Sequence, residues 1–167
     1  MNYTVLSQRY AVRLLTEVDI PEMLALFRGN PLFYQHCPPP PSAETAREAM
    51  HALPPRKTMA DKHFLGFFDG ETLAAVLDLI TGFPTPEIAF WGFFMLDAAV
   101  QGRGMGSALV SELCASLRQQ GFRAVRLGWV KTNPQSAHFW KKNGFTETGV
   151  TYDTDGYTVV VAQKELT

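Results

Sequence analysis

The sequence predicts a single α/β domain of the α+β kind over residues 1–167, in which about four helices flank a mixed, mostly antiparallel sheet of about seven strands. Three observations support this fold class. A chain of 167 residues that is 46% hydrophobic has the size and apolar content of one domain with a substantial core. Short apolar runs typical of strands occur toward both ends of the chain. Between them, residues 87–130 read as strand, glycine-rich loop, helix and strand, an order that favours a mixed sheet.

The first third of the chain predicts one strand and two helices. Residues 9–16 (RYAVRLLT) are typical of a short strand. Residues 16–27 predict a helix that begins at a threonine with an aspartate three residues later, a relative of the capping box. Residues 36–42 contain four prolines, which predict a stiff extended segment without helix. A second helix is predicted over residues 42–53, with a serine as its N-cap.

The remaining strands are predicted from apolar runs and turn residues. Residues 63–80 predict a hairpin whose strands join at an Asp-Gly pair. The continuous apolar run at residues 87–96 is typical of a strand covered on both faces, so we expect it at the centre of the sheet. Residues 122–130 predict another strand, and residues 145–166 predict a second hairpin around another Asp-Gly pair.

Two more helices are predicted in the second half of the chain. The first follows the glycine-rich loop and ends near Gly121, a suitable C-terminal cap. Its apolar face consists of Leu109, Val110, Leu113, Cys114 and Leu117. The second is short and runs through Lys142. Asn133 and Pro134 suit its N-cap and first helical position.

Charge and composition exclude several classes of function. Fifteen Lys and Arg against 16 Asp and Glu leave no basic excess for binding nucleic acid through its phosphates. The chain has no apolar run of about 18 residues, and its N-terminus is unlike a signal peptide, so a soluble, cytoplasmic protein without membrane contact is expected. The two cysteines and three of the four histidines show no metal-ligand or triad spacing, so no metal site is predicted. These residues are Cys37, Cys114, His36, His63 and His138.

The stretch VQGRGMGSALV, residues 100–110, places three glycines directly before a helix. Glycine in a helix costs roughly 1 kcal/mol relative to alanine, so such a cluster needs a reason. A bare loop at the positive end of a helix dipole exposes backbone N–H groups to an anion and can cradle a phosphate. The nucleotide P-loop pattern fits poorly, because neither lysine nor threonine follows Gly106. The dinucleotide pattern fits poorly too, because its third glycine is missing.

A third phosphate-binding pattern matches. Gln101, Gly104 and Gly106 have the spacing [QR]xxGx[GA], and this segment resembles the pyrophosphate loop of the GNAT superfamily of acyl-CoA-dependent N-acyltransferases. The flanking sequence FFMLDAAVQGRGMGSALV resembles the family's strand, loop and helix. NPQSAHFWKKNGF, residues 133–145, resembles its later helix motif, and RLLTEVDIPEM resembles its first strand and helix. The resemblance therefore covers nearly the whole chain.

The resemblance implies a sheet whose fourth and fifth strands splay apart, with acetyl-CoA in the cleft between them. The amides of Gly102 to Gly106 would hold the pyrophosphate, with Arg103 adding charge, and the main chain of Phe94 and Leu96 would pair with the pantetheine arm. Asn133 would either contact that arm or act only as a helix cap. The residues expected to contact acetyl-CoA are Phe94, Met95, Leu96, Gln101, Gly102, Arg103, Gly104, Met105, Gly106, Ser107, Asn133, Phe139 and Trp140.

Direct transfer to an amine requires a neutral amine, stabilisation of the developing oxyanion and departure of a thiolate. The resemblance suggests the backbone N–H of Leu96 as the oxyanion donor. Candidate general bases are Glu87 and Asp78, the carboxylates closest to the central strands. The alternative is that both side chains face solvent and that water takes the proton.

The chain departs from the family at Trp140, where many members have a tyrosine that protonates the leaving sulfur. An indole is only a hydrogen-bond donor and does not titrate usefully. Tyr152 or Tyr157 could replace the tyrosine only if the fold brings one of them into the cleft.

The predicted function is acetyl-CoA-dependent transfer of an acetyl group to a primary amine of a small molecule or peptide, by a monomer or homodimer. The alternative is an acyl-CoA-binding module without turnover, which the missing tyrosine favours. The sequence does not identify the amine. The aromatic run FWGFF, residues 90–94, fits an apolar or aromatic substrate, but it fits a plain core equally well.

Overall fold

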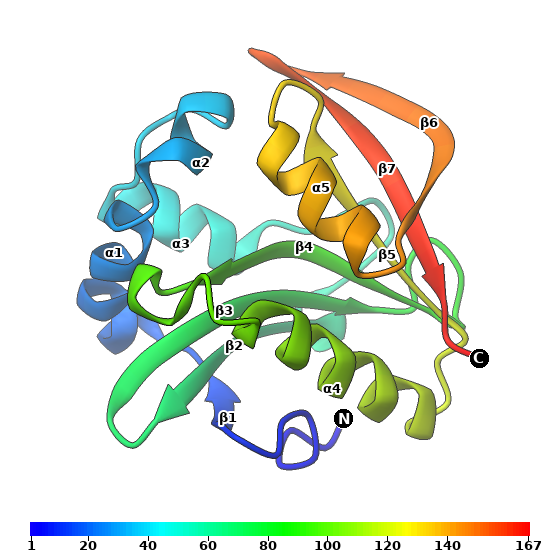
Figure 1. The fold of residues 1–167 in the computed structure, drawn as a ribbon, viewed down its shortest axis with the longest axis horizontal. Coiled ribbons are helices and arrows are strands. Elements are labelled where there is room, and N and C mark those ends of the chain that lie inside the picture. Colours follow the sequence, from blue (N-terminus) through cyan, green and yellow to red (C-terminus); the bar gives the residue numbers. More distant parts are fainter.

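The computed structural model describes all residues from 1 to 167 and shows one seven-stranded sheet of strand order β1-β2-β3-β4-β5-β7-β6 (Figure 1). The strands are β1 (Ala11–Leu14), β2 (Lys62–Asp69), β3 (Thr72–Thr81), β4 (Ile88–Leu96), β5 (Ala124–Val130), β6 (Thr146–Thr154) and β7 (Tyr157–Glu165). The α-helices are α1 (Ile20–Arg28), α2 (Pro31–His36), α3 (Ala43–His51), α4 (Met105–Gln119) and α5 (Pro134–Lys142).

The predicted mixed sheet is confirmed. Every neighbouring pair of strands is antiparallel except β4 and β5, which α4 connects as a crossover and which therefore run parallel. The predicted strands, both predicted hairpins and all four predicted helices are present. Helix α2 was not predicted, because the four prolines that follow it suggested an extended segment from His36 onward; His36 is in fact the last residue of this helix.

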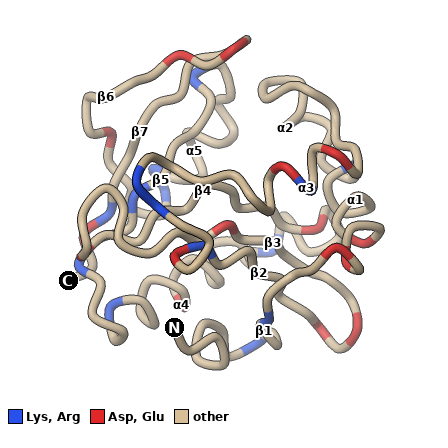
Figure 2. Tube along the Cα trace, turned by 180° about the vertical axis from the view of Figure 1, so that it is seen from behind, with Lys and Arg blue, Asp and Glu red and all other residues tan.

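The sheet is covered on both faces by helices (Figure 1). On one face α1 and α3 pack against β2, β3 and β4 around a cluster that includes Met23, Phe27 and Val76. On the other face α4 packs through its predicted apolar residues, and α5 adds Trp140 to the same cluster. No helix has both the length and the apolar character needed to cross a membrane. Positive and negative side chains are interspersed along the chain, while α2 and β4 have no charged residue (Figure 2).

The central strands part halfway along their length. β4 and β5 are paired only from Ile88–Ala124 to Trp91–Leu127, and beyond this fork they diverge, as Figure 1 shows. Each strand continues on its outer side, β4 against β3 and β5 against β7. The expectation that residues 87–96 are covered on both faces is therefore wrong beyond the fork. Gly92 is exposed, and Phe93 and Phe94 are half-buried, because β5 no longer lies beside them.

Candidate active site

A cleft of about 670 Å³ opens where β4 and β5 diverge. It is bounded by the glycine loop, α5, α2 and the hairpin of β6 and β7. Of the residues expected to contact acetyl-CoA, all line this cleft except Arg103 and Met105. Arg103 is exposed on the loop, and Met105 packs against the core beneath it.

The glycine loop has the backbone conformation that its sequence suggested. Gly102 and Gly104 have φ angles of 76° and 74°, in the left-handed region that favours glycine. A Cβ built on either residue would have no heavy atom within 4 Å, so the space outside the loop is open. The loop therefore leaves its backbone accessible to a ligand.

Helix α4 begins without a side-chain cap. Its N-cap is Gly104, and the first N–H with a partner in the helix is that of Ala108, which donates to the Gly104 carbonyl at 3.0 Å. The N–H groups of Met105, Gly106 and Ser107 come before it and have no partner within the helix. Helices α3 and α5, by contrast, have side-chain caps. The longest helix thus presents uncapped N–H groups and the positive end of its dipole to the cleft.

The main chain of β4 faces the gap at Phe94 and Leu96. Asp97 donates its N–H to Ala74 of β3 at 2.8 Å, and antiparallel pairing alternates along the strand. Phe94 and Leu96 therefore turn their N–H and C=O groups away from β3. The Leu96 carbonyl already accepts hydrogen bonds from the side-chain amides of Asn30, at 3.0 Å, and Gln101, at 2.9 Å. Gln101 thus holds the loop against the end of β4.

Asp78 lies beside the fork on β3. The register of β3 and β4 shifts next to it, and Gly92 is the extra residue in β4. A Cβ built on Gly92 would lie 2.6 Å from the Asp78 Oδ2 atom, so a side chain there would displace the carboxylate. Lys62 donates to Asp78 Oδ1 at 2.9 Å and to the Ala52 carbonyl at 2.7 Å. Burial raises the pKa of Asp78, and the Lys62 ammonium partly opposes this shift.

Tyr152 lies on the opposite side of the fork. Its hydroxyl oxygen would be 4.0 Å from a Cβ built on Gly128, the residue after the last paired position of β5. Tyr152 and Tyr157 both line the cleft, so the fold does bring tyrosines into it. Burial, with Cys37 nearby, raises the pKa of Tyr152. A hydrogen bond with Cys37, together with burial, raises the pKa of Tyr157 to about 12.

Neither candidate base lines the cleft, but Asp78 lies directly behind Gly92, which does, whereas Glu87 lies away from it. Glu87 directly precedes β4, at the end of the strand away from the loop, and its side chain is exposed. Hydrogen bonds from its own backbone N–H and from Thr85 lower the pKa of Glu87, which makes it a weaker base. No group of three or more His, Cys, Asp or Glu side chains lies close enough together to hold a metal ion.

Trp140 belongs to an aromatic cluster under α5. Its ring lies 5.6 Å from that of Phe94, 4.9 Å from Phe139 and 5.2 Å from Phe145, between ring centroids. Phe139 reaches the glycine loop, where a Cβ built on Gly106 would lie 3.1 Å from its ring. Asn133 starts the helix by accepting the Ser136 N–H at 3.2 Å, so its capping role is present in the structure.

Helix α2, which the sequence analysis missed, lies across the open end of the gap. At its start Asn30 bonds the Leu96 carbonyl at the end of β4. At its last residue, His36 Nδ1 and the Thr132 hydroxyl, just beyond β5, are 3.0 Å apart. Leu32 and Phe33 line the cleft between these two anchors. A sequence signal existed, because Asn30 and Pro31 repeat the Asn-Pro pair that predicted α5.

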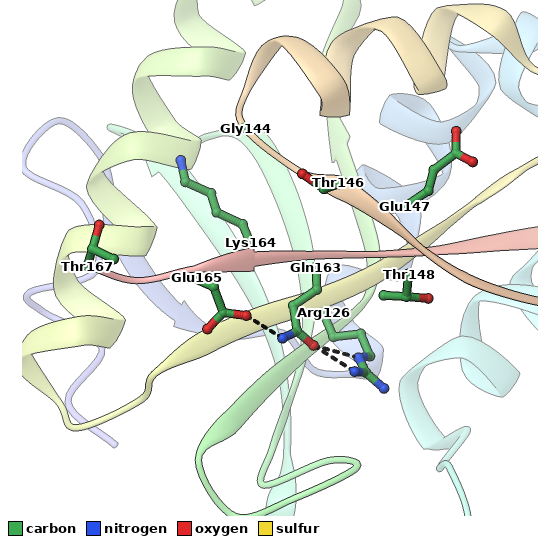
Figure 3. Close-up of a pocket in the computed structure, with 9 residues that line it drawn as sticks. All are labelled: Arg126, Gly144, Thr146, Glu147, Thr148, Gln163, Lys164, Glu165 and Thr167. Atoms are coloured by element: carbon green, nitrogen blue, oxygen red, sulfur yellow. Dashed lines mark hydrogen bonds between the residues drawn. The ribbon is translucent and has the colours of Figure 1, made fainter.

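A second hollow, of about 510 Å³, lies elsewhere on the sheet, over β5, β7 and β6 (Figure 3). Its lining has no hydrophobic residue. Arg126 donates to the Gln163 side-chain oxygen at 2.9 and 2.7 Å, and Gln163 donates in turn to Glu165. None of the predicted site residues lies in this hollow, so the cleft at the fork is the candidate active site.

Comparison with known proteins supports the family resemblance of the sequence. A sequence model of the acetyltransferase (GNAT) family matches residues 30–145. The fold is similar to that of an acetyltransferase from Thermus thermophilus, with a TM-score of 0.69, 22% sequence identity and coverage of 93% of this chain and 96% of that one. A search of curated proteins found no match.

Two further solved structures share the fold. The ribosomal-protein-S18-alanine N-acetyltransferase from Escherichia coli has a TM-score of 0.65 and 16% identity, and 94% of each chain is covered. The PaiA N-acetyltransferase from Thermoplasma acidophilum, solved in complex with coenzyme A, also has a TM-score of 0.65, with 21% identity and coverage of 93% of this chain and 98% of that one.

Proposed function

From the premise that this chain belongs to the GNAT family of acetyltransferases, we propose that it transfers the acetyl group of acetyl-CoA directly to a primary amine. Family membership makes the chain an enzyme of the N-acetyltransferase class. The proposal concerns the donor, the acceptor group and the residues that act on them.

One observation carries the choice of donor. The bare glycine loop and the uncapped start of α4 meet at the same end of the cleft. Such N–H groups at a helix N-terminus favour a phosphate. From there the cleft continues along the free edge of β4 to the fork. A phosphate group joined to a long, extended arm matches this shape, and acetyl-CoA has both. The open space outside Gly102 and Gly104 fits the group.

The main chain of β4 would bind the arm as a strand binds its neighbour. We assign the Leu96 N–H to the arm, since Leu96 lies beside the loop and its carbonyl is already bonded to Asn30 and Gln101. Phe94 is two residues, or about 7 Å, closer to the fork, so its N–H is better placed to stabilise the oxyanion. The proposed oxyanion donor is therefore the N–H of Phe94 and not that of Leu96, which the sequence analysis expected.

Acetyl-CoA supplies the thioester carbon that the amine attacks. The C–N bond forms, the C–S bond breaks, the amine loses a proton and the CoA sulfur gains one. Asp78 is the carboxylate beside the fork and is assigned as the base, acting past the bare Gly92. Tyr152 is assigned as the donor to the leaving sulfur, because its hydroxyl lies over Gly128 and its raised pKa keeps it protonated at neutral pH.

The function is tested by thiol release from acetyl-CoA in the presence of a panel of amines, with mass spectrometry of the acylated product. We expect release of free thiol and a matching amount of N-acetylated amine. Binding of acetyl-CoA, measured by calorimetry, without turnover of any amine would instead support an acyl-CoA-binding module and contradict the transfer.

The base is tested by the dependence of kcat/KM on pH. Asp78 must be deprotonated to accept a proton, so activity should fall as the pH drops through its raised pKa. An unsubstituted alkylamine is the acceptor for this test, because its ammonium ionises near the lysine value of about 10.4, well above the carboxylate limb. Asp78→Asn should remove most activity together with this limb.

Two control variants separate chemistry from structure. Lys62→Met breaks the same buried ion pair but keeps the carboxylate, so it should shift the pH limb upward rather than abolish it. Glu87→Gln should behave as the wild type. Equal loss of activity in Asp78→Asn and Lys62→Met, with no pH limb in either, would show that Asp78 acts only through the structure.

A further inference from the structure

We propose that the acceptor is a small primary amine on an aromatic or aliphatic skeleton that has no second charged group. This inference rests on the proposed function and names the substrate class of the same cleft. It is drawn from the walls that face the fork from the side opposite the glycine loop.

The first wall is α2, which lies across the open end of the gap. Leu32 and Phe33 of this helix line the cleft, and the ring of Phe33 packs edge-on against Phe93 of β4, with centroids 5.7 Å apart. Phe93 in turn packs edge-on against Phe27 of α1 at 5.3 Å. Both rings are therefore held in place by the core, and together they form a fixed apolar surface beside the fork.

The second wall is the hairpin of β6 and β7. Tyr152 and Tyr157 line the cleft from this side, and Cys37, just after α2, closes the space between the two walls. Burial raises the pKa of the Cys37 thiol, so this group is neutral at physiological pH, as are both tyrosines. The acceptor end of the cleft, defined here as Leu32, Phe33, Cys37, Tyr152 and Tyr157, is thus apolar and aromatic with neutral polar groups.

Charge separates this end from the rest of the cleft. Among all residues that line the cleft, Lys142 is the only one with an ionic side chain. Lys142 lies one helical turn after Phe139, whose ring touches the glycine loop, so its charge belongs to the phosphate end. Apart from Asp78, which lies behind Gly92 and is paired with Lys62, no carboxylate borders this end, and no arginine lines the cleft. A second ammonium or a carboxylate on the acceptor would lose water there without gaining a partner of opposite charge.

Two carboxylates of the hairpin lie outside the cleft. Asp153 and Asp155 sit at the exposed tip of the hairpin, and Asp153 accepts a hydrogen bond from the Thr158 hydroxyl at 2.6 Å. Carboxylates in water attract a cation only weakly, and salt screens the attraction over about 10 Å at 0.1 M ionic strength. They can speed the approach of an ammonium but do not bind a second one inside the cleft.

The size of the cleft sets the scale of the acceptor. Clefts of about 300–1,000 Å³ hold one ligand of drug size. The volume of about 670 Å³ includes the path of the pantetheine arm along β4, so the remainder suits a small molecule rather than a folded peptide segment.

Matched pairs of amines test the inference. Hexylamine and 1,6-diaminohexane differ by one ammonium group, and 2-phenylethylamine and phenylalanine differ by one carboxylate. We expect kcat/KM to favour the member of each pair that lacks the second charged group by about thirtyfold or more. Preference for the diamine or for phenylalanine would overturn the substrate class while leaving the transferase function intact. A phenylalanine-initiated tripeptide that outperforms 2-phenylethylamine would also overturn it.

Variants assign the selectivity to the acceptor end. Phe33→Ala should lower kcat/KM for 2-phenylethylamine about tenfold through KM, with acetyl-CoA affinity unchanged. Leu32→Glu places a carboxylate in the wall and should shift preference toward 1,6-diaminohexane. Leu53→Glu makes the same substitution at an exposed leucine outside the cleft and should have no effect. An equal shift in Leu32→Glu and Leu53→Glu would contradict the assignment. Thiol release with none of these amines, while acetyl-CoA still binds, would instead contradict the proposed function.

Discussion

The two ends of the cleft are built in different ways. At the phosphate end, one continuous segment, residues 96–107, supplies the loop, and its main chain does most of the proposed binding. At the acceptor end, side chains come from α2, the residue after it and the hairpin of β6 and β7, which are far apart in the sequence. Main-chain recognition depends on glycine spacing and is readable from sequence. Side-chain recognition depends on tertiary placement, which can change without altering a motif.

Trp140 tests whether the side chains beside β4, between the two ends, act through packing alone. The ring is 8% exposed, so Trp140→Ala should leave a cavity and lower the free energy of unfolding by about 3–5 kcal/mol. Urea denaturation measures this loss. Trp140→Phe keeps an aromatic ring and removes no titrating group, so it should retain acetyl transfer within about tenfold. Trp140→Tyr should also transfer, and it adds a hydroxyl at the position where many family members have one.

The outcome for Trp140→Phe decides between packing and chemistry. If this variant folds and binds acetyl-CoA normally but no longer transfers the acetyl group, the indole N–H has a specific role in the reaction. Recognition of acetyl-CoA would then depend on a side chain as well as on the main chain, and the contrast with the acceptor end would be smaller.

Gly104 tests the role of the main chain directly. Valine at φ 74° is strained, and its side chain would fill the open space outside the loop. Gly104→Val should weaken acetyl-CoA binding about a hundredfold, equivalent to about 2.7 kcal/mol, as measured by calorimetry. Wild-type affinity should also decrease with added salt, because the proposed contacts involve phosphate charge.

Gly70→Val is the matched control for this prediction. Gly70 has a φ of 61°, no neighbour within 4 Å of a built Cβ, and a place in the turn between β2 and β3. Valine at this position therefore imposes a similar backbone strain, but away from the cleft. Normal acetyl-CoA affinity in Gly104→Val, or an equal loss of affinity in both variants, would show that the loop does not bind acetyl-CoA.

Asn133 tests the boundary between a structural and a ligand-binding role. Its side chain caps α5 and is 3% exposed, although it also lines the cleft. Asn133→Ala should cost about 1 kcal/mol of stability, and Asn133→Ser should restore most of it because serine is an equally good cap. If capping is the whole role, Asn133→Ser binds acetyl-CoA as the wild type does. A loss of affinity in both variants would indicate a direct contact with the pantetheine arm.

The sequence predicted most of the fold, because its signals are local. The Asp-Gly pairs located both hairpins, and Asn133 with Pro134 located α5. The same Asn-Pro pair at residues 30–31 was overlooked, since the prolines after Cys37 argued against a helix nearby. The continuous apolar run of β4 suggested burial on both faces; its aromatic residues instead line a gap that only the divergence of β5 creates.

The candidate site was predicted unevenly. Most residues expected around the glycine loop line the cleft, because strand, loop and helix fix their relative positions. Asp78 and Glu87 looked equivalent in the sequence, and only the strand register separates them by placing Asp78 beside Gly92. The position of Tyr152 over β5 depends on how the last hairpin folds back, and no local pattern encodes it.

Cys37 provides the smallest expected effect and tests whether the acceptor end is a passive wall. It is the only thiol that lines the cleft, and a thiol is intrinsically the most nucleophilic group that could form an acetylated intermediate there. Burial raises the pKa of this thiol, and a protonated thiol is a poor nucleophile at neutral pH. Cys37→Ser should therefore keep kcat/KM within about threefold, because serine retains a small polar group at the same place. Alkylation by iodoacetamide should be slow at neutral pH and accelerate only as the pH rises through the raised pKa. A rapid burst of CoA release without amine, with an acetyl group found on Cys37 by mass spectrometry, would show that transfer occurs in two steps through an acetylated enzyme. Cys37 would then take part in the reaction and would not be only a wall of the cleft.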